Sequence, residues 1–332
     1  MGQEFHFRDK VPVAVLGATG TVGRVFVELL KEHPWFQLAH LIASDASKGK
    51  MFGEVAKLPK DHSEYSTIIK GLDPSIECSL VFSALDHEMA KTAEKEFVAA
   101  GHTVISCSKS HRMDPDVPLV VPEVNGNQVR RGLVTSPNCV VAGLALLLQP
   151  LHQAFGLQSV EISTLQSISG AGAKAKELDV ENNIIPFIDD EEDKIITEPK
   201  KILDDSSIVL SAQVSRVPII EGHMAFVSFS CEKRPEKAQI VEAFNTFTGR
   251  PQELNLVSAP KKPIHYDEAK DYPQARHHKG IDKGMAISVG QCKPGAFDDW
   301  RCVMLVHNTV RGGAGNAVLI AEQMLVDGLL FW

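Results

Sequence analysis

The sequence lacks the features that mark several large classes of protein. Six cysteines are present but no CxxC pair, so neither a zinc site nor a disulfide framework is indicated and no metal is expected. Basic residues are not in excess, because 42 Asp and Glu outnumber 34 Lys and Arg, so nucleic acid and anionic membranes are poor partners. No apolar run approaches the roughly 18 residues of a transmembrane helix, and the first residues form no signal-peptide core. We therefore expect a cytoplasmic protein with no nucleic-acid and no membrane partner.

The composition is that of an ordinary globular chain with room for two domains. Apolar residues make up 44% of the 332 residues, and a domain usually takes roughly 150 residues. Strand-like and helical runs alternate up to residue 136, which indicates βαβ units and a parallel sheet. A long apolar helix, interrupted by Pro150, follows, and the later strands alternate like those of a mostly antiparallel sheet. The acidic stretch 189–193 is expected to be a solvated loop or edge. The sequence thus predicts an α/β domain of nucleotide-binding type followed by an α+β domain.

A glycine-rich turn joins the first predicted strand to the first predicted helix. Gly17, Gly20 and Gly23 follow the apolar run 11–16 and precede an amphipathic helix. In this context glycines let backbone N–H groups approach a pyrophosphate at the helix N-terminus. The pattern therefore predicts a dinucleotide site.

The loop after the second predicted strand bears on the choice between NAD and NADP. Asp45 could hold the ribose hydroxyls of NAD, whereas Ser47, Lys48 and Lys50 could hold the 2′-phosphate of NADP. Lysines in loops are usually solvated, so the residue types in this loop do not by themselves decide between NAD and NADP.

Cys139 differs from the other cysteines because it precedes a helix. It lies between a Ser-Pro-Asn turn and the long apolar helix, where the helix dipole is expected to lower the thiol pKa and supply thiolate. Asn138 beside it can donate an amide hydrogen to a developing oxyanion. Four other cysteines lie in apolar strands and are expected to be buried, namely Cys78, Cys107, Cys231 and Cys302. Cys292 lies at a strand end and is not assigned to either group.

Arg216 and His223 are seven residues apart across a bend that contains Pro218 and Gly222. Histidine titrates in the range that a cysteine nucleophile needs from its base, and arginine can bind a carboxylate through two hydrogen bonds. The alternative is an edge strand with a solvated arginine, and the spacing alone does not exclude it.

Taken in order, GATGTVG, SPNC, LQSISGAG and RVPIIEGH give the chain a clear resemblance to a known family. It resembles aspartate-β-semialdehyde dehydrogenase, and the archaeal and fungal branch most closely. The likeness covers nearly the whole chain, since residues 111–125, 191–203 and 307–323 also fit. It implies NADP-dependent reduction of L-aspartyl 4-phosphate to L-aspartate 4-semialdehyde with release of phosphate. That step serves the biosynthesis of lysine through diaminopimelate and of threonine, methionine and isoleucine.

The resemblance also implies an architecture. The fold class is α/β, with a Rossmann-type parallel-sheet domain over residues 1–138 plus 313–332. An α+β catalytic and dimerisation domain with a mostly antiparallel sheet spans 139–312. The expected partners are a small-molecule substrate and phosphate, and the expected assembly is a homodimer or homotetramer.

Roles in catalysis follow from the resemblance residue by residue. Cys139 is expected to be the nucleophile and His223 the acid/base. Substrate would be bound by Gln166, by Arg216 at the α-carboxylate, by Glu192 of the EExK pattern at the amine, and by Asn138. Phosphate would be held by Arg112 and Lys194. The expected cofactor-binding residues are Gly17, Thr19, Gly20, Thr21, Val22, Gly23, Ser44, Ser47, Lys48, Ser169, Gly170, Asn308 and Gly313.

Three departures from the family pattern are visible. Val140-Val141 follows the cysteine where the family usually has Ser or Thr, which removes a hydroxyl. Ala46 replaces an arginine that would lie near the 2′-phosphate, and Lys48 compensates, so NADP stays favoured over NAD. Gly312-Gly313 stands where Gly-Ala is more usual.

Three other functions are weighed as alternatives. A malonyl-CoA or succinyl-CoA reductase would use the same cysteine chemistry, but Arg112 and Lys194 favour an acyl phosphate. N-acetylglutamyl-phosphate reductase normally has glycine where Asn138 stands. A non-catalytic paralogue would generally lack Cys139 or His223, and this chain has both.

Overall fold

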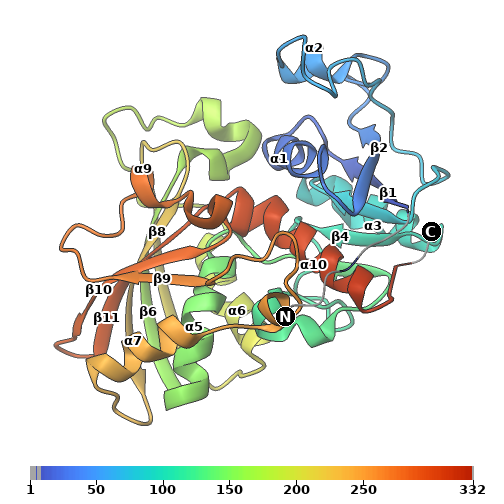
Figure 1. Cartoon of the computed structure of the whole chain (residues 1–332). Helices are drawn as coiled ribbons and strands as arrows, with labels where there is room; N and C mark the ends of the chain where they lie inside the picture. The colour runs from blue at the N-terminus through green and yellow to red at the C-terminus, as the bar shows by residue number, and fades with distance from the viewer. Residues whose placement is uncertain (1–4, 6–8, 331–332) are drawn as a thin grey trace.

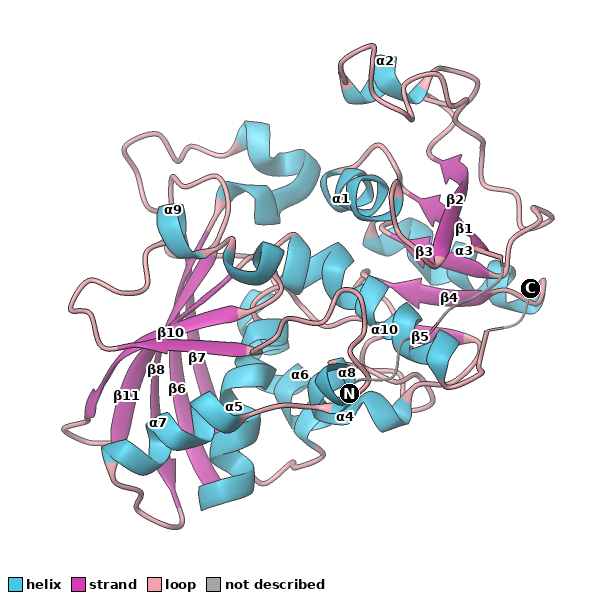
Figure 2. Ribbon diagram, in the orientation of Figure 1, coloured by secondary structure: helices cyan, strands magenta, loops and turns pink. Residues whose placement is uncertain are grey.

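A computed structural model describes residue 5 and residues 9–330 (Figure 1). The expected boundaries therefore include a few residues, 1–4, 6–8 and 331–332, that lie outside the described part. The chain forms a five-stranded and a six-stranded sheet, and Figure 2 shows helices packed against both. None of the helices in the described part is long and apolar enough to cross a membrane.

The first sheet is entirely parallel, with strand order β2-β1-β3-β4-β5. Its strands are β1 (Val11–Leu16), β2 (Phe36–Ile42), β3 (Leu80–Ser83), β4 (Thr103–Ser106) and β5 (Leu133–Thr135). Valines 11, 13 and 15 pack with α1 (Thr21–Leu30) and α10 (Gly315–Val326) on one face. Ala14 and Leu16 pack with α3 (His87–Ala99) on the other. Helices on both faces explain why the central strands β1 and β3 are almost entirely apolar.

An excursion of the chain separates β2 from β3. It contains the short helix α2 (Phe52–Ala56), which stands apart from the sheet in Figure 1. The chain then returns beside the edge strand, where the N–H of Lys70 donates to Leu41 O at 2.8 Å and the N–H of Ala43 donates to Lys70 O at 3.1 Å. This return segment forms the outer border of the first domain.

The second sheet is mixed, with strand order β7-β6-β8-β11-β10-β9. Its strands are β6 (Leu157–Gln166), β7 (Val209–Arg216), β8 (His223–Cys231), β9 (Ile264–Asp267), β10 (Ile287–Pro294) and β11 (Trp300–Val306). Three neighbouring pairs are antiparallel and two are parallel. One face packs against α5 (Val141–Phe155), α6 (Glu191–Leu203) and α7 (Lys237–Thr246). The other face carries exposed side chains such as Phe226 (46% exposed).

Short helical turns make most of the remaining connections. They are α4 (Pro122–Asn125), η1 (Gly126–Gln128), η2 (Ile168–Glu177), α8 (Arg250–Glu253), α9 (Ala275–His278), η3 (Ile281–Gly284) and η4 (Val310–Ala314).

The predicted fold class is confirmed, with two differences in detail. Helix α5 continues through Pro150, so the expected interruption is wrong. The acidic stretch 189–193 is not a solvated loop throughout, because α6 begins at Glu191 and this side chain is buried.

Candidate active site

The turn that carries Cys139 lies at the carboxyl edge of the parallel sheet, between β5 and α5. Asn138 shapes this turn, because its Oδ1 accepts hydrogen bonds from the N–H groups of Val140 (2.9 Å) and Val141 (3.4 Å) at the start of α5. Its Nδ2 donates to Oε1 of Glu191 at 2.9 Å. Asn138 therefore caps the helix and orients a carboxylate, in addition to the oxyanion role expected for it.

The thiol of Cys139 is neutral in the free protein. Burial raises its pKa to about 12, Glu191 adds to this rise, and Arg112, Arg216 and Lys194 act in the opposite direction. The expectation of a lowered thiol pKa at a helix start is therefore wrong for this site, because the loss of hydration outweighs the favourable charges. Three cationic side chains nevertheless lie within electrostatic reach of the sulfur, so they stabilise a thiolate once it forms.

His223, the first residue of β8, is fully buried and presents one ring nitrogen for chemistry. Its Nδ1 accepts a hydrogen bond from the N–H of Ser167 at 3.0 Å, so in the neutral ring the proton resides on Nε2. Nε2 is buried and has no hydrogen-bond partner among the residues described. Burial lowers the pKa of His223 to about 3, with a further contribution from Arg216, so the ring is neutral at physiological pH. It is arranged as a hydrogen-bond donor.

Strand register brings two of the expected substrate-binding residues together. Gln166 and Arg216 are direct partners at the ends of the parallel strands β6 and β7. Arg216 Nη1 donates to Ser167 O at 2.7 Å, and Gln166 Nε2 donates to Oε1 of Glu191 at 3.0 Å. Both side chains are buried, so their polar groups face a confined site.

The acidic residue in this cluster is Glu191 and not Glu192. Glu191 is buried, and its Oε2 accepts a hydrogen bond from Lys194 Nζ at 3.1 Å, whereas Glu192 is exposed. The two differ because α6 begins at Glu191, and consecutive helical residues point about 100° apart. Burial alone would raise the pKa of Glu191, but Lys194, Asn138 and Gln166 together lower it. The structure therefore places Glu191, and not the predicted Glu192, beside Asn138, Gln166 and Lys194.

The two expected phosphate ligands both lie near the sulfur. Lys194 is partly buried beside Glu191. Arg112 is buried in the loop after β4, where its Nη1 donates to Oε1 of Glu198 at 2.9 Å and its Nη2 donates to Cys107 O at 2.8 Å. Both side chains act electrostatically on Cys139. The site therefore has the positive charge that an anionic leaving group requires.

The glycine turn has the close packing that a dinucleotide site needs. Gly17 has φ +74°, and a Cβ on it would lie 2.5 Å from Ala84 O. A Cβ on Gly23 would lie 2.1 Å from Gly17 O, so this glycine lets α1 approach β1. Gly20 is exposed directly before α1 begins at Thr21, which leaves the helix N-terminus open to a phosphate. These residues fit the pyrophosphate of a dinucleotide.

Other expected cofactor residues connect this turn to the catalytic groups. A Cβ on Gly313 would lie 3.7 Å from Val22, so the segment before α10 borders the turn. Asn308 Nδ2 donates to Ser169 Oγ at 2.8 Å. Gly170 lies against the catalytic cluster, since a Cβ on it would be 2.9 Å from Arg216 Nη1 and 2.9 Å from His223 Nε2. Ser169 and Gly170 thus lie between the cofactor turn and the substrate side of the site.

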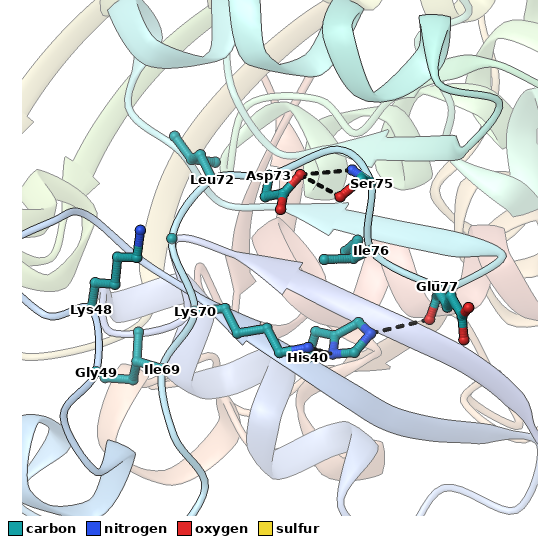
Figure 3. A pocket seen from close by; sticks show the side chains of 11 residues that line it. His40, Lys48, Gly49, Ile69, Lys70, Leu72, Asp73, Ser75, Ile76 and Glu77 are labelled. Carbon is teal, nitrogen blue, oxygen red and sulfur yellow. Dashed lines mark hydrogen bonds between the residues drawn. The ribbon is translucent and has the colours of Figure 1, made fainter.

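The expected 2′-phosphate loop follows β2. Ser44 and Lys48 are exposed and Ser47 is partly buried. Lys48 lines a cavity of about 620 Å³ at the outer edge of the sheet, together with Lys70 (Figure 3). In this cavity Lys70 Nζ is 3.0 Å from His40 Nδ1, and burial together with Lys70 lowers the pKa of His40. The cavity holds cationic side chains but none of the catalytic ones.

Comparisons with known proteins agree with this geometry. Residues 12–131 match the family model described as semialdehyde dehydrogenase, NAD binding domain, and residues 148–311 match its dimerisation domain. Aspartate-semialdehyde dehydrogenase from Schizosaccharomyces pombe is 39% identical over 96% of this chain and 99% of its own length. The one from Methanothermobacter thermautotrophicus is 38% identical over 94% and 98%. The chain belongs to the aspartate-semialdehyde dehydrogenase family.

A solved structure of a member of this family has the same fold. Aspartate semialdehyde dehydrogenase with NADP from Candida albicans superimposes with a TM-score of 0.87 at 33% identity, covering 97% of this chain and 100% of that one. The enzyme from Vibrio cholerae, at 23% identity and a TM-score of 0.81, shows the likeness of fold alone.

Sequence reasoning missed several groups of this family site. Ser167 orients His223 through its backbone N–H, and Glu191 is the glutamate that contacts Asn138. Glu198 and Lys201 contact Arg112, the former at its guanidinium and the latter at its backbone carbonyl. The spacing of Glu191, Lys194, Glu198 and Lys201 contained a signal, because steps of three and four residues place side chains on one helix face.

Proposed function

We propose that this chain reduces L-aspartyl 4-phosphate to L-aspartate 4-semialdehyde and releases phosphate. The observation that carries the proposal is that Arg112, Arg216 and Lys194 lie within electrostatic reach of Cys139. Arg112 and Lys194 are each linked through one glutamate to Asn138, the residue before Cys139. An anionic leaving group and an anionic substrate each need such charge. The reaction would serve lysine (through diaminopimelate), threonine, methionine and isoleucine biosynthesis. The CoA-ester alternative is less favoured, because a CoA thiol leaving group needs no phosphate-binding cations.

The buried polar groups would bind the substrate at three points. Arg216 would hold the α-carboxylate, since a guanidinium matches a carboxylate through two hydrogen bonds. Glu191, in place of Glu192, would hold the amine, and Gln166 would orient the chain between them. Arg112 and Lys194 would hold the phosphate.

The residues of the chain divide one difficult displacement into two easier steps. The Cys139 sulfur attacks the acyl carbon, the carbon–oxygen bond to phosphate breaks, and a thioester forms, while the thiol proton leaves with the phosphate as hydrogenphosphate. The glycine turn would hold NADPH, which would supply the hydride that reduces this thioester. The Nε2–H of His223 donates a hydrogen bond to the oxygen that then carries negative charge. Collapse of this tetrahedral adduct breaks the carbon–sulfur bond, restores the carbonyl and releases the aldehyde, and the Cys139 thiolate takes up a proton from solvent.

Further features of the molecule are part of the proposal. NADP is favoured over NAD, supported by Lys48 and by the NADP in the Candida albicans relative. The exposed face of the six-stranded sheet, which includes Phe226, would join two copies into a homodimer or, by further contacts, a homotetramer. The domain boundaries would fall at 138/139 and 312/313. The protein would act in the cytoplasm.

The test is the reverse reaction. Purified protein with L-aspartate 4-semialdehyde should reduce NADP in a phosphate-dependent manner, NAD should be reduced more slowly, and Cys139→Ser should abolish both. Oxidation of NADPH by malonyl-CoA or succinyl-CoA, with no phosphate dependence for the semialdehyde, would instead establish the CoA-ester reading. Inactivity in both assays with intact cofactor binding would favour the non-catalytic paralogue.

A further inference from the structure

The side chain of Arg112 is held by a helix of the other domain. Arg112 lies in the loop after β4 of the five-stranded sheet. Its partner Glu198 lies on α6, which packs against the six-stranded sheet. The guanidinium donates to Oε1 of Glu198 at 2.9 Å and to Cys107 O at 2.8 Å. Its Nε is buried and has no hydrogen-bond partner in the part of the chain that the structure describes. Two of the five N–H donors of the guanidinium therefore fix the group in place, and Nε–H is one of the three that are left for a ligand.

Glu198 connects this arginine to the nucleophile turn. The residue is 1% exposed, and its second oxygen, Oε2, accepts a hydrogen bond from the backbone N–H of Asn138 at 2.6 Å. The same carboxylate thus contacts Arg112 and the residue before Cys139. An ionised carboxylate has two acceptor oxygens, whereas an amide has one, so glutamine cannot satisfy both donors.

Lys201 holds the backbone of the same loop. It follows Glu198 by three residues on α6, so the two lie on one helix face. Its Nζ donates to three backbone carbonyls, those of Arg112 at 2.7 Å, Asp114 at 2.8 Å and Val117 at 2.8 Å. An ammonium has three donors, and all three are used here. The loop therefore bends around the lysine of a helix distant in sequence.

We propose that Glu198 and Lys201 are positioning residues for phosphate, which act by setting Arg112 against the Cys139 turn. This inference rests on the proposed function and deepens it. Glu198 fixes the guanidinium and Lys201 fixes the backbone that carries it. Helix α6 also carries Lys194, so a single helix places both phosphate-binding cations. The ligand recognised through them is an oxygen-rich anion, the phosphate released from or added to the acyl group.

The test compares Michaelis constants in the phosphate-dependent direction. We expect Glu198→Gln and Lys201→Met each to raise the KM for phosphate about tenfold or more, as loss of a hydrogen bond to a charged group does. The KM for NADP should stay within about twofold in both variants, because the cofactor turn is distant from these contacts. Lys201 contacts the arginine-bearing loop and not Asn138, so Lys201→Met should also leave the KM for the semialdehyde within about twofold. If Glu198→Gln does not fold, Glu198→Asp keeps the charge, withdraws the carboxylate from both donors and gives the same contrast.

A matched control is available in Glu322→Gln. Glu322 is also a buried carboxylate with two donors, the N–H of Ser258 at 3.0 Å and the ring of His33 at 3.0 Å. None of these groups belongs to the site. The KM for phosphate should be that of the unaltered protein, even if Tm falls.

A double substitution separates positioning from general structural damage. If Lys201 acts through Arg112, then Lys201→Met should raise the KM for phosphate in the unaltered protein but not further in Arg112→Lys. An equal further rise in both backgrounds, or an unchanged KM for phosphate in both single variants, would overturn the inference. Failure of the proposed function is a different result, namely the absence of phosphate dependence in the unaltered protein.

Discussion

Gly170 lies directly against the imidazole of His223. A Cβ built on Gly170 would come within 2.9 Å of His223 Nε2, the nitrogen that carries the ring proton, and equally close to Arg216 Nη1. Because Gly170 has no side chain, it leaves space beside both the Nε2–H donor of His223 and the guanidinium of Arg216.

Gly170→Ala should therefore impair catalysis more than stability. The added methyl group would displace His223 or Arg216, and misplacement of catalytic groups by about 1 Å can cost roughly 10²-fold in rate. The measurement is kcat/KM for the semialdehyde together with Tm. Gly280→Ala is the control, because a Cβ there would meet nothing within 4 Å. Full activity of Gly170→Ala would show that the site has more room than the structure indicates.

The neighbouring glutamates of α6 should behave very differently. Glu191→Gln removes a buried charge that binds Asn138, Gln166 and Lys194, so we expect the KM for the semialdehyde to rise about tenfold or more. Glu192→Gln alters an exposed side chain and should leave kinetics within about twofold. Steady-state kinetics of the pair checks the assignment. The reverse pattern would restore Glu192 as the substrate ligand.

The reactivity of Cys139 should rise steadily with pH. Because burial raises its pKa to about 12, the thiolate fraction should increase about tenfold per pH unit between pH 7 and 9. The rate of iodoacetamide modification at Cys139, followed by mass spectrometry, measures this. A plateau near neutral pH would mean that the thiol pKa is low after all.

His223 should make the protein less stable in acid. Its pKa is lowered from about 6.5 in the unfolded chain to about 3 in the folded one, so between these pH values only the unfolded state takes up the proton. The free energy of unfolding should therefore lose about 1.4 kcal/mol per pH unit as pH falls through this window. Denaturant titrations from pH 8 to pH 4 should give a shallower pH dependence for His223→Gln. Identical slopes for the two proteins would contradict a buried, neutral histidine.

Arg311 and Glu123 form a buried ion pair with two hydrogen bonds, at 2.7 and 2.5 Å, that joins α4 to the segment before α10. Arg311→Met should cost about 3–5 kcal/mol in the free energy of unfolding, because it leaves a buried carboxylate unpaired. Replacing both residues, with Glu123→Leu added, should cost less than Arg311→Met alone. Denaturation midpoints at constant m-value test this, and equal losses would mean that the unpaired charge is hydrated.

Local patterns were enough to predict the glycine turn and the place of Cys139, because both depend on a strand, a turn and a helix that are contiguous in sequence. Gln166 and Arg216 required the register of two strands more than 40 residues apart along the chain, and sequence spacing does not encode that register. The choice between Glu191 and Glu192 depended on where α6 begins. The helix begins directly after Asp190, which has a φ of +56°. No pattern in the sequence predicted this left-handed conformation.

The position of α10 constrains how the molecule can be made. This last helix packs in the same apolar core as β1 and Phe26, although it is nearly 300 residues away along the chain. During synthesis the ribosome releases the first sheet long before the helix that completes its core. The cofactor domain therefore gains its full stability only after α10 has been synthesised, and until then the exposed apolar face of its early strands is open to chaperones.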